Sequence, residues 1–112
     1  MTLDELRKQK STPLKGAQHA LGAAKAKDLH GALPGWEMSP DAKEIHKNFK
    51  FKDFAHALSF VNALGWIAEQ ENHHPDVELG WGRCTVHFST HDVGGLSMND
   101  FICAAKVEAL GA

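Results

Sequence analysis

The sequence has no excess of charge of either sign. It holds 12 Lys and Arg against 14 Asp and Glu, a formal net charge of −2 over 112 residues. Proteins that bind nucleic acid or anionic lipid gather Lys and Arg on one face. The near balance therefore argues against nucleic acid and a membrane surface as partners, and it favours a small ligand.

Long apolar runs and a cysteine framework are missing as well. No segment approaches the roughly 20 apolar residues that cross a bilayer, and Asp4 and Glu5 stand where a signal peptide would be basic and apolar. The two cysteines, Cys84 and Cys103, lie in apolar segments and lack the short spacing of a disulfide framework. These features predict reduced core thiols in a cytoplasmic protein.

What the sequence does contain is one alternating series of helical and strand patterns. Residues 1–14 are polar and broken by Pro13, so we expect a flexible N-terminal arm ahead of a single domain over residues 15–112. The predicted elements of the domain are a helix over residues 16–32, strands over 36–38 and 44–51, a helix from Asp53 to 72, strands over 77–81 and 84–88, and a helix from Ser97 to about 110. This order, α-β-β-α-β-β-α, predicts an α+β fold with a four-stranded antiparallel sheet and three helices packed on one face.

Two adjacent histidines end the central predicted helix. They stand in the segment Glu69-Gln70-Glu71-Asn72-His73-His74-Pro75. Because Pro75 disfavours helical backbone at His74, the helix must end here with both rings at its mouth. An unperturbed imidazole titrates near about 6.5 and can give or take a proton at neutral pH. The pair is therefore a candidate site for acid–base chemistry.

A metal site is the first alternative, because the chain has eight histidines. His87-x-x-x-His91 has the spacing of a helical zinc pair, but apolar residues alternate along 84–88 and predict a strand. On a strand, positions four apart are separated by about 13 Å, too far to bind one ion. His73 and His74 are neighbours, and adjacent side chains usually diverge. We therefore expect no metal.

Covalent catalysis and phosphate binding have little support in the sequence. Both cysteines occupy apolar positions of predicted elements, and burial disfavours the reactive thiolate. No serine lies in a nucleophile elbow, and Gly94-Gly95 lacks the lysine of a phosphate-binding loop. Proton transfer by histidine is the chemistry that remains.

The spacing of several residues resembles the signature of the pterin-4a-carbinolamine dehydratases. The signature residues are Glu69-x-x-x-His73-His74-Pro75, Trp81, His91 and Asp100. Three further stretches are similar to the family's entry to its first strand, its second strand with the start of the central helix, and its ligand loop: Leu33-Pro34-Gly35-Trp36, Phe49-x-Phe51-x-Asp53-Phe54, and Thr90-His91-Asp92 with Gly94-Gly95-Leu96. Only about the first 30 residues lie outside the resemblance.

The resemblance implies a function as well as the α+β fold. Family members remove water from the 4a-hydroxytetrahydropterin that aromatic amino acid hydroxylases form, and the product is a quinonoid dihydropterin. It implies a homodimer or homotetramer, a functional link to such a hydroxylase, a role in tetrahydrobiopterin recycling, and no cofactor, since the pterin is the substrate. The alternatives are a non-catalytic pterin-binding protein and a transcription-factor dimerisation cofactor.

The resemblance also implies roles for residues. His73, His74 and His91 would be catalytic, with His73 and His91 as acids for the two epimers of the carbinolamine and His74 holding the ring. Asp100 would give structural support as a helix cap. The implied substrate-binding residues are Glu69, Asn72, Pro75, Trp81, Ser89, Thr90 and Asp92.

Other interpretations stay open for some of these residues. For Trp81 the other interpretation is an aromatic side chain that packs against the protein rather than against a ligand. For Glu69 it is a solvated residue on the surface of the helix. His87 has no counterpart in the signature. The remaining histidines are interpreted as surface or packing residues: His19, His30, His46 and His56.

Overall fold

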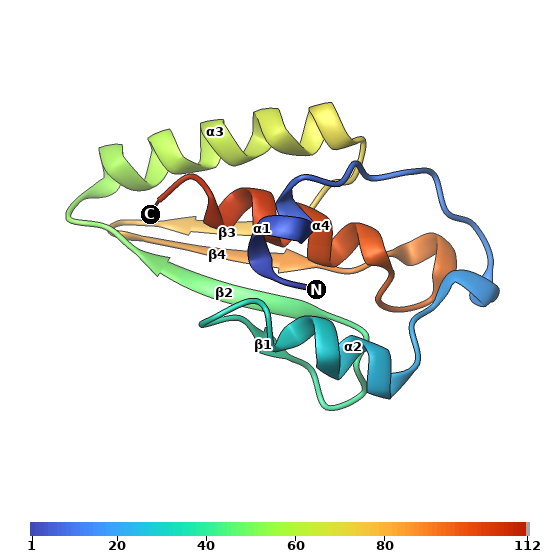
Figure 1. Ribbon diagram of the computed structural model, residues 1–112. Coiled ribbons are helices and arrows are strands. Elements are labelled where there is room, and N and C mark those ends of the chain that lie inside the picture. The colour runs from blue at the N-terminus through green and yellow to red at the C-terminus, as the bar shows by residue number, and fades with distance from the viewer. Residues whose placement is uncertain (112) are drawn as a thin grey trace.

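The computed structural model describes residues 1–111, and it contains one four-stranded sheet with helices against it (Figure 1). The elements in chain order are α1 (Leu3–Arg7), η1 (Ala17–His19), α2 (Ala23–His30), β1 (Glu37–Met38), β2 (Ile45–Lys50), α3 (Phe54–Glu71), β3 (Asp76–Gly80), β4 (Arg83–Phe88), η2 (His91–Val93) and α4 (Met98–Glu108). The strand order is β1-β2-β4-β3, and every neighbouring pair is antiparallel. The predicted α+β fold with a four-stranded antiparallel sheet is confirmed.

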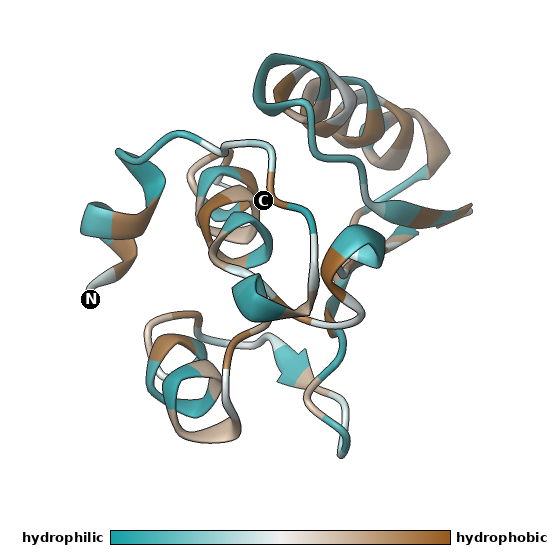
Figure 2. Ribbon diagram, turned by 90° about the vertical axis from the view of Figure 1, so that its right-hand side faces the viewer, coloured by the Kyte–Doolittle hydropathy of each residue, from teal (hydrophilic) through white to brown (hydrophobic). Residues whose placement is uncertain are grey.

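The core lies on one face of this sheet because apolar residues alternate with polar ones along the strands. Ile45 and Phe49 of β2 and Val86 of β4 are all buried. Phe60 of α3 packs on Phe49 with ring centroids 4.7 Å apart. Brown and teal stretches alternate around the helices in Figure 2, as expected for helices with one buried face. Among residues 1–111 no helix is long and apolar enough to cross a membrane.

The segment predicted as one helix over residues 16–32 is shorter and broken in the structure. It forms η1 and then α2, which begins after Gly22 as its N-cap. The backbone N–H groups of Gly16 and Leu21 donate to the carbonyls of Asp92 and Leu96, at 2.8 and 2.9 Å. These bonds tie the segment to the loop around η2, so tertiary hydrogen bonds override the helical composition.

The N-terminal segment contains α1, a helix that the sequence does not predict. Thr2 caps it in a capping box with Glu5, and Leu6 is fully buried in the core. Figure 1 shows α1 lying over α4. Farther along, the backbone N–H of Ser11 donates to the Glu71 carboxylate at 2.8 Å. The domain boundary near residue 14 stays a prediction, but the segment before it is attached to the domain by these contacts.

Both cysteines are buried and unpaired. Burial raises the pKa of Cys84, and it raises the pKa of Cys103 to about 12, with Glu71 and Asp100 adding to the shift. We therefore expect neither thiol to react with iodoacetamide at pH 8 in the native protein, and both to react in denaturant. Mass spectrometry after brief alkylation checks this, and a fast-labelled native thiol would contradict it.

Candidate active site

The end of α3 presents the two adjacent histidines. Asn72 follows the helix in the left-handed region, at φ 48 and ψ 42, a conformation that asparagine adopts more readily than most residues. The backbone N–H of His73 donates back to the Ala68 carbonyl at 3.1 Å, closing the helix end. Pro75 follows, and β3 begins at the next residue. His73 and His74 therefore stand in the short link between helix and sheet.

His73 is held on two sides. Its Nε2 lies 2.6 Å from the Asp100 Oδ1, and its ring is stacked on Phe88 with centroids 6.0 Å apart and an interplanar angle of 11°. Its side chain is only 10% exposed. Because the carboxylate can only accept at Nε2, it holds the proton there and leaves Nδ1 as the nitrogen free for proton transfer.

Asp100 links this ring to the start of α4. Its Oδ2 accepts from the Thr90 hydroxyl at 2.7 Å and from the Ser97 backbone N–H at 3.0 Å. Ser97 and Asp100 form the capping box of α4, and the Thr90 and Ser97 hydroxyls lie 2.8 Å apart. Asp100 has no exposed surface, so its carboxylate depends on these partners. One buried group thus caps a helix and orients His73.

His74 lies in a different environment, although it is the next residue. Its Nε2 is 2.6 Å from the Glu69 Oε1, one helical turn back, and both side chains are mostly exposed. The ring is free to contact a bound molecule from the solvent side. Glu69 touches His74 and does not line the hollow described next.

A hollow of about 250 Å³ lies between the end of α3 and the loop after β4. It brings together seven of the residues that the sequence singles out: Asn72, His73, His74, Ser89, Thr90, His91 and Asp92. The 3₁₀ turn η2 and the Thr90–Gly95 bridge hold the exposed His91 across from the two helix-end histidines. Pockets for drug-sized ligands usually have volumes above about 300 Å³. This hollow is slightly smaller, so it suits a ligand no larger than a small ring system.

Two neighbouring hollows extend the site to residues that the sequence analysis missed. One of about 170 Å³ is lined by His73, Thr90 and the segment 12–15 from the N-terminal arm. Another of about 240 Å³ joins His91 to Lys43. For the hollow lined by residues 12–15, the one signal in the sequence was Pro13, which interrupts the polar N-terminal segment. Nothing in the sequence places Lys43 there, because that depends on how the chain folds back.

Trp81 is not brought into this site, although the sequence analysis groups it with the substrate-binding residues. It lies in the turn between β3 and β4, where it is 73% exposed. β3 separates it from the histidines by about 16 Å of strand. The two residues of the turn are Trp81 and Gly82, and Gly82 takes the positive φ of 69 that the turn requires. Pro75 shapes the link and does not line the hollow either.

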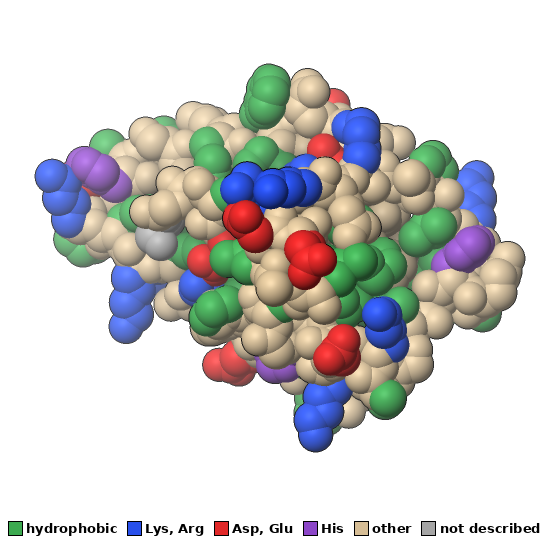
Figure 3. Space-filling model, in the orientation of Figure 1, with side chains coloured by type: hydrophobic (Ala, Val, Ile, Leu, Met, Phe, Trp, Pro, Cys, Tyr) green, Lys and Arg blue, Asp and Glu red, His purple; other side chains and the backbone are tan. Residues whose placement is uncertain are grey.

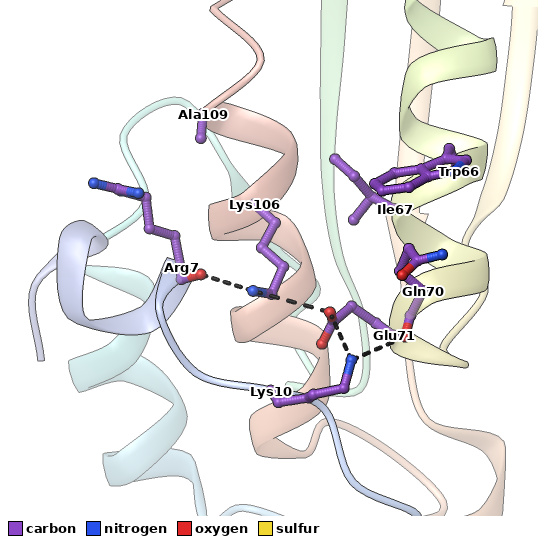
Figure 4. Close-up of a pocket in the computed structure, with 8 residues that line it drawn as sticks. All are labelled: Arg7, Lys10, Trp66, Ile67, Gln70, Glu71, Lys106 and Ala109. Atoms are coloured by element: carbon purple, nitrogen blue, oxygen red, sulfur yellow. Dashed lines mark hydrogen bonds and ion pairs between the residues drawn. The ribbon is translucent and has the colours of Figure 1, made fainter.

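A hollow of about 350 Å³ lies away from the histidines between α1, α3 and α4 (Figure 4). Its charged groups already have partners: Lys10 and Lys106 lie 3.4 and 3.9 Å from the Glu71 Oε2, and Lys106 also donates to the Arg7 carbonyl. These contacts attach α1 and the segment after it to the domain, and they leave neither lysine free for acid–base chemistry.

The site around His73 contains no set of three ligand-type side chains at metal-binding spacing among residues 1–111. The one such set in that range lies on the polar face of the sheet. On the face drawn in Figure 3, acidic and basic side chains are interspersed, without a broad patch of one sign. The geometry around His73 suits proton transfer to and from a small polar ring.

Comparison with known proteins agrees with this geometry. The family described as pterin 4 alpha carbinolamine dehydratase matches residues 19–110, so the match begins earlier in the chain than the sequence resemblance. A protein of Stenotrophomonas maltophilia (strain K279a), provisionally named a pterin-4-alpha-carbinolamine dehydratase, is 50% identical over 105 residues, 94% of this chain and 90% of its own. A Xanthomonas campestris protein (strain 8004) with the same provisional name is 52% identical over 98 residues, 88% of this chain and 83% of its own.

Two solved structures share the fold. A transcriptional coactivator/pterin dehydratase from Brucella melitensis superposes with a TM-score of 0.77 at 30% identity, covering 82% of this chain and 98% of that one. A pterin dehydratase-like protein described as a RuBisCO assembly factor has a TM-score of 0.59 at 23% identity and covers 70% of this chain and 90% of its own, so it supports the fold alone.

Proposed function

The chain belongs to the pterin-4a-carbinolamine dehydratase family, and we propose that it removes water from 4a-hydroxytetrahydropterin to give quinonoid dihydropterin in tetrahydrobiopterin recycling. The observation that supports this most is the convergence of His73, His74 and His91 on one hollow, with Asp100 behind His73. Three imidazoles around a small cavity suit a reaction that consists of proton transfers.

The proposed reaction breaks one C–O bond and one N–H bond. An acid protonates the 4a-hydroxyl, which leaves as water, and a base takes the proton from the adjacent ring nitrogen as the C=N bond forms. His73, whose Nδ1 is free, serves one of these steps, and His91 faces it from the loop after β4. His74 contacts the ring from the solvent side. The pterin is the substrate, and no metal or other cofactor takes part.

The two epimers of the carbinolamine carry the hydroxyl on opposite faces of the ring. Acids on both sides of the hollow let one site dehydrate both. His73 comes from the helix end and His91 from η2, so the two rings approach the hollow from different elements. We assign one epimer to each of these histidines, with His74 holding the ring for both.

The direct test follows quinonoid dihydropterin formation from freshly prepared carbinolamine by absorbance, with and without the protein. We expect the protein to accelerate dehydration well above the spontaneous rate, and a chelator to leave the rate unchanged. A protein that binds the pterin without accelerating its dehydration would favour the non-catalytic alternative. Inhibition by the chelator would show that a metal takes part.

We also propose that the protein forms a homodimer or homotetramer in the cytoplasm and serves an aromatic amino acid hydroxylase. The long helix α3 carries large apolar side chains that are exposed in the single chain, with Trp66 66%, Phe54 43% and Leu58 41% exposed. The unpaired buried thiols suit a reducing compartment. The Brucella relative is named both a coactivator and a dehydratase, but the histidine arrangement here favours the enzyme.

A further inference from the structure

The face of the sheet that points away from the core carries a pair of histidines. His46 on β2 stands directly opposite His87 on β4 in the antiparallel register. Their rings are stacked, with centroids 5.4 Å apart and an interplanar angle of 27°. Glu44, just before β2, lies beside both rings. From the sequence, His46 is interpreted as a surface or packing residue, because its pairing with His87 depends on a strand register that the sequence does not reveal.

The nitrogens of this pair converge on one carboxylate oxygen. The Glu44 Oε2 lies 3.1 Å from the His87 Nδ1 and 3.6 Å from the His46 Nδ1. One ligand atom from each of the three residues falls within 4.8 Å of the others. In a tetrahedral zinc site with bonds near 2.0–2.1 Å, the ligand atoms are about 3.3 Å apart. The distances from the Glu44 Oε2 to the two Nδ1 atoms, 3.1 and 3.6 Å, lie just below and just above this separation.

We propose that Glu44, His46 and His87 form a binding site for a divalent transition-metal cation of the Zn²⁺ class. Two imidazoles and one carboxylate suit Zn²⁺ and its neighbours better than Mg²⁺ or Ca²⁺, which prefer oxygen ligands. Three protein ligands on a partly exposed sheet face leave the fourth position to water. The ion would connect β2 and β4, the two central strands.

The outer nitrogen of His87 also has the hydrogen-bond partner that metal-bound histidines need, and the outer nitrogen of His46 has a carboxylate near it. The His87 Nε2 lies 2.7 Å from the Glu78 Oε2, and the His46 Nε2 lies 3.5 Å from the Glu37 Oε2. A carboxylate on the far nitrogen fixes the ring so that its other nitrogen faces the ion, and it makes that nitrogen a better ligand. The Nδ1 of each ring lies on the side of Glu44, and the Glu78 carboxylate fixes this orientation for His87.

One atom of the cluster lacks a hydrogen bond. The Nδ1 of His46 is buried and has no hydrogen-bond partner in the described part of the chain. Leaving a buried polar atom unpaired costs on the order of 1–3 kcal/mol. Its nearest acidic oxygen, on Glu44, is 3.6 Å away, beyond hydrogen-bonding range. A cation between these atoms would give the His46 Nδ1 a partner.

Calorimetric titration of chelator-treated, dialysed protein with ZnCl₂ tests the site. We expect one ion per chain, and we expect His46→Gln to weaken zinc binding by more than about 100-fold. Glu78→Gln removes only the outer partner of His87, so we expect a loss of about 10-fold. The matched control is His56→Gln, which removes an exposed histidine bonded to Asp53 and should bind zinc as the unaltered chain does.

Further variants and readouts separate this site from the pterin site. His74→Gln, at the candidate active site, should retain zinc binding, and His46→Gln should retain dehydratase activity and its circular dichroism spectrum. Equal zinc affinity in His46→Gln and the unaltered chain would overturn the proposal, as would loss of zinc binding in His74→Gln alone. The proposal does not rest on the proposed function, because zinc binding is measured without the pterin.

Discussion

Replacing His73 with alanine is expected to lower kcat/KM for the 4a-carbinolamine by about a hundred- to ten-thousandfold, the usual contribution of a general acid or base. The ring is the only one of the three site histidines that is both nearly buried and held by a buried carboxylate. Its loss removes a positioned group for proton transfer and leaves a cavity that water can enter. The measurement is the initial rate of dehydration on each separated epimer.

The epimers make this prediction specific. His73→Ala should slow one epimer more than the other, and His91→Ala should show the opposite preference. His56→Ala is the control, because His56 lies in the first turn of α3, about 25 Å of helix away from His73. Small and equal losses for both epimers in both site variants would contradict the assignment.

Replacing Asp100 with alanine is expected to lower the free energy of unfolding by about 3 kcal/mol, because it leaves buried donors without an acceptor. Three groups lose their partner: the His73 ring, the Thr90 hydroxyl and the Ser97 backbone N–H. The capping box of α4 is lost with them. Urea unfolding followed by circular dichroism measures the change.

A second variant separates stability from activity. Asp100→Asn keeps the shape of the side chain but turns one oxygen into a donor, so it cannot accept from both His73 and α4. Assayed where it is still folded, it should lose kcat with little change in KM, and that split identifies a positioning residue. Asp28→Ala, on the exposed face of α2, should change the unfolding free energy by less than about 0.5 kcal/mol. A similarly small change for Asp100→Ala would contradict the role of the network.

The elements with strong periodicity could be predicted from the sequence. The apolar spacing of α3 and the alternation in β4 placed both elements within a residue or two of their observed bounds. The start of α2 was wrong, because hydrogen bonds to the η2 loop compete with helix formation at residues 16–21. α1 was missed because a five-residue helix has little periodicity and is stabilised by burying Leu6.

The part of the candidate site that depends on local sequence could be predicted, and the part that depends on contacts between distant segments could not. The position of His73 and His74 at the end of α3 could be predicted, because Pro75 requires the helix to end before it. The contact between His73 and Asp100 spans 27 positions and requires the packing of α4 against the end of α3. The grouping of His46 with His87 depends on strand register, which one sequence does not reveal.

The attachment of the N-terminal segment has a consequence for how shortened forms of the protein should be designed. Residues 12–15 form one wall beside His73, and Thr12 exchanges two hydrogen bonds with the Asn99 side chain, at 3.1 and 2.6 Å. The family match begins only at residue 19. A version trimmed to that match would keep every histidine of the candidate site, but it would lose the wall that residues 12–15 form beside His73 and the buried Leu6 that fills part of the core, so a shortened form that keeps the site enclosed must begin ahead of the family match.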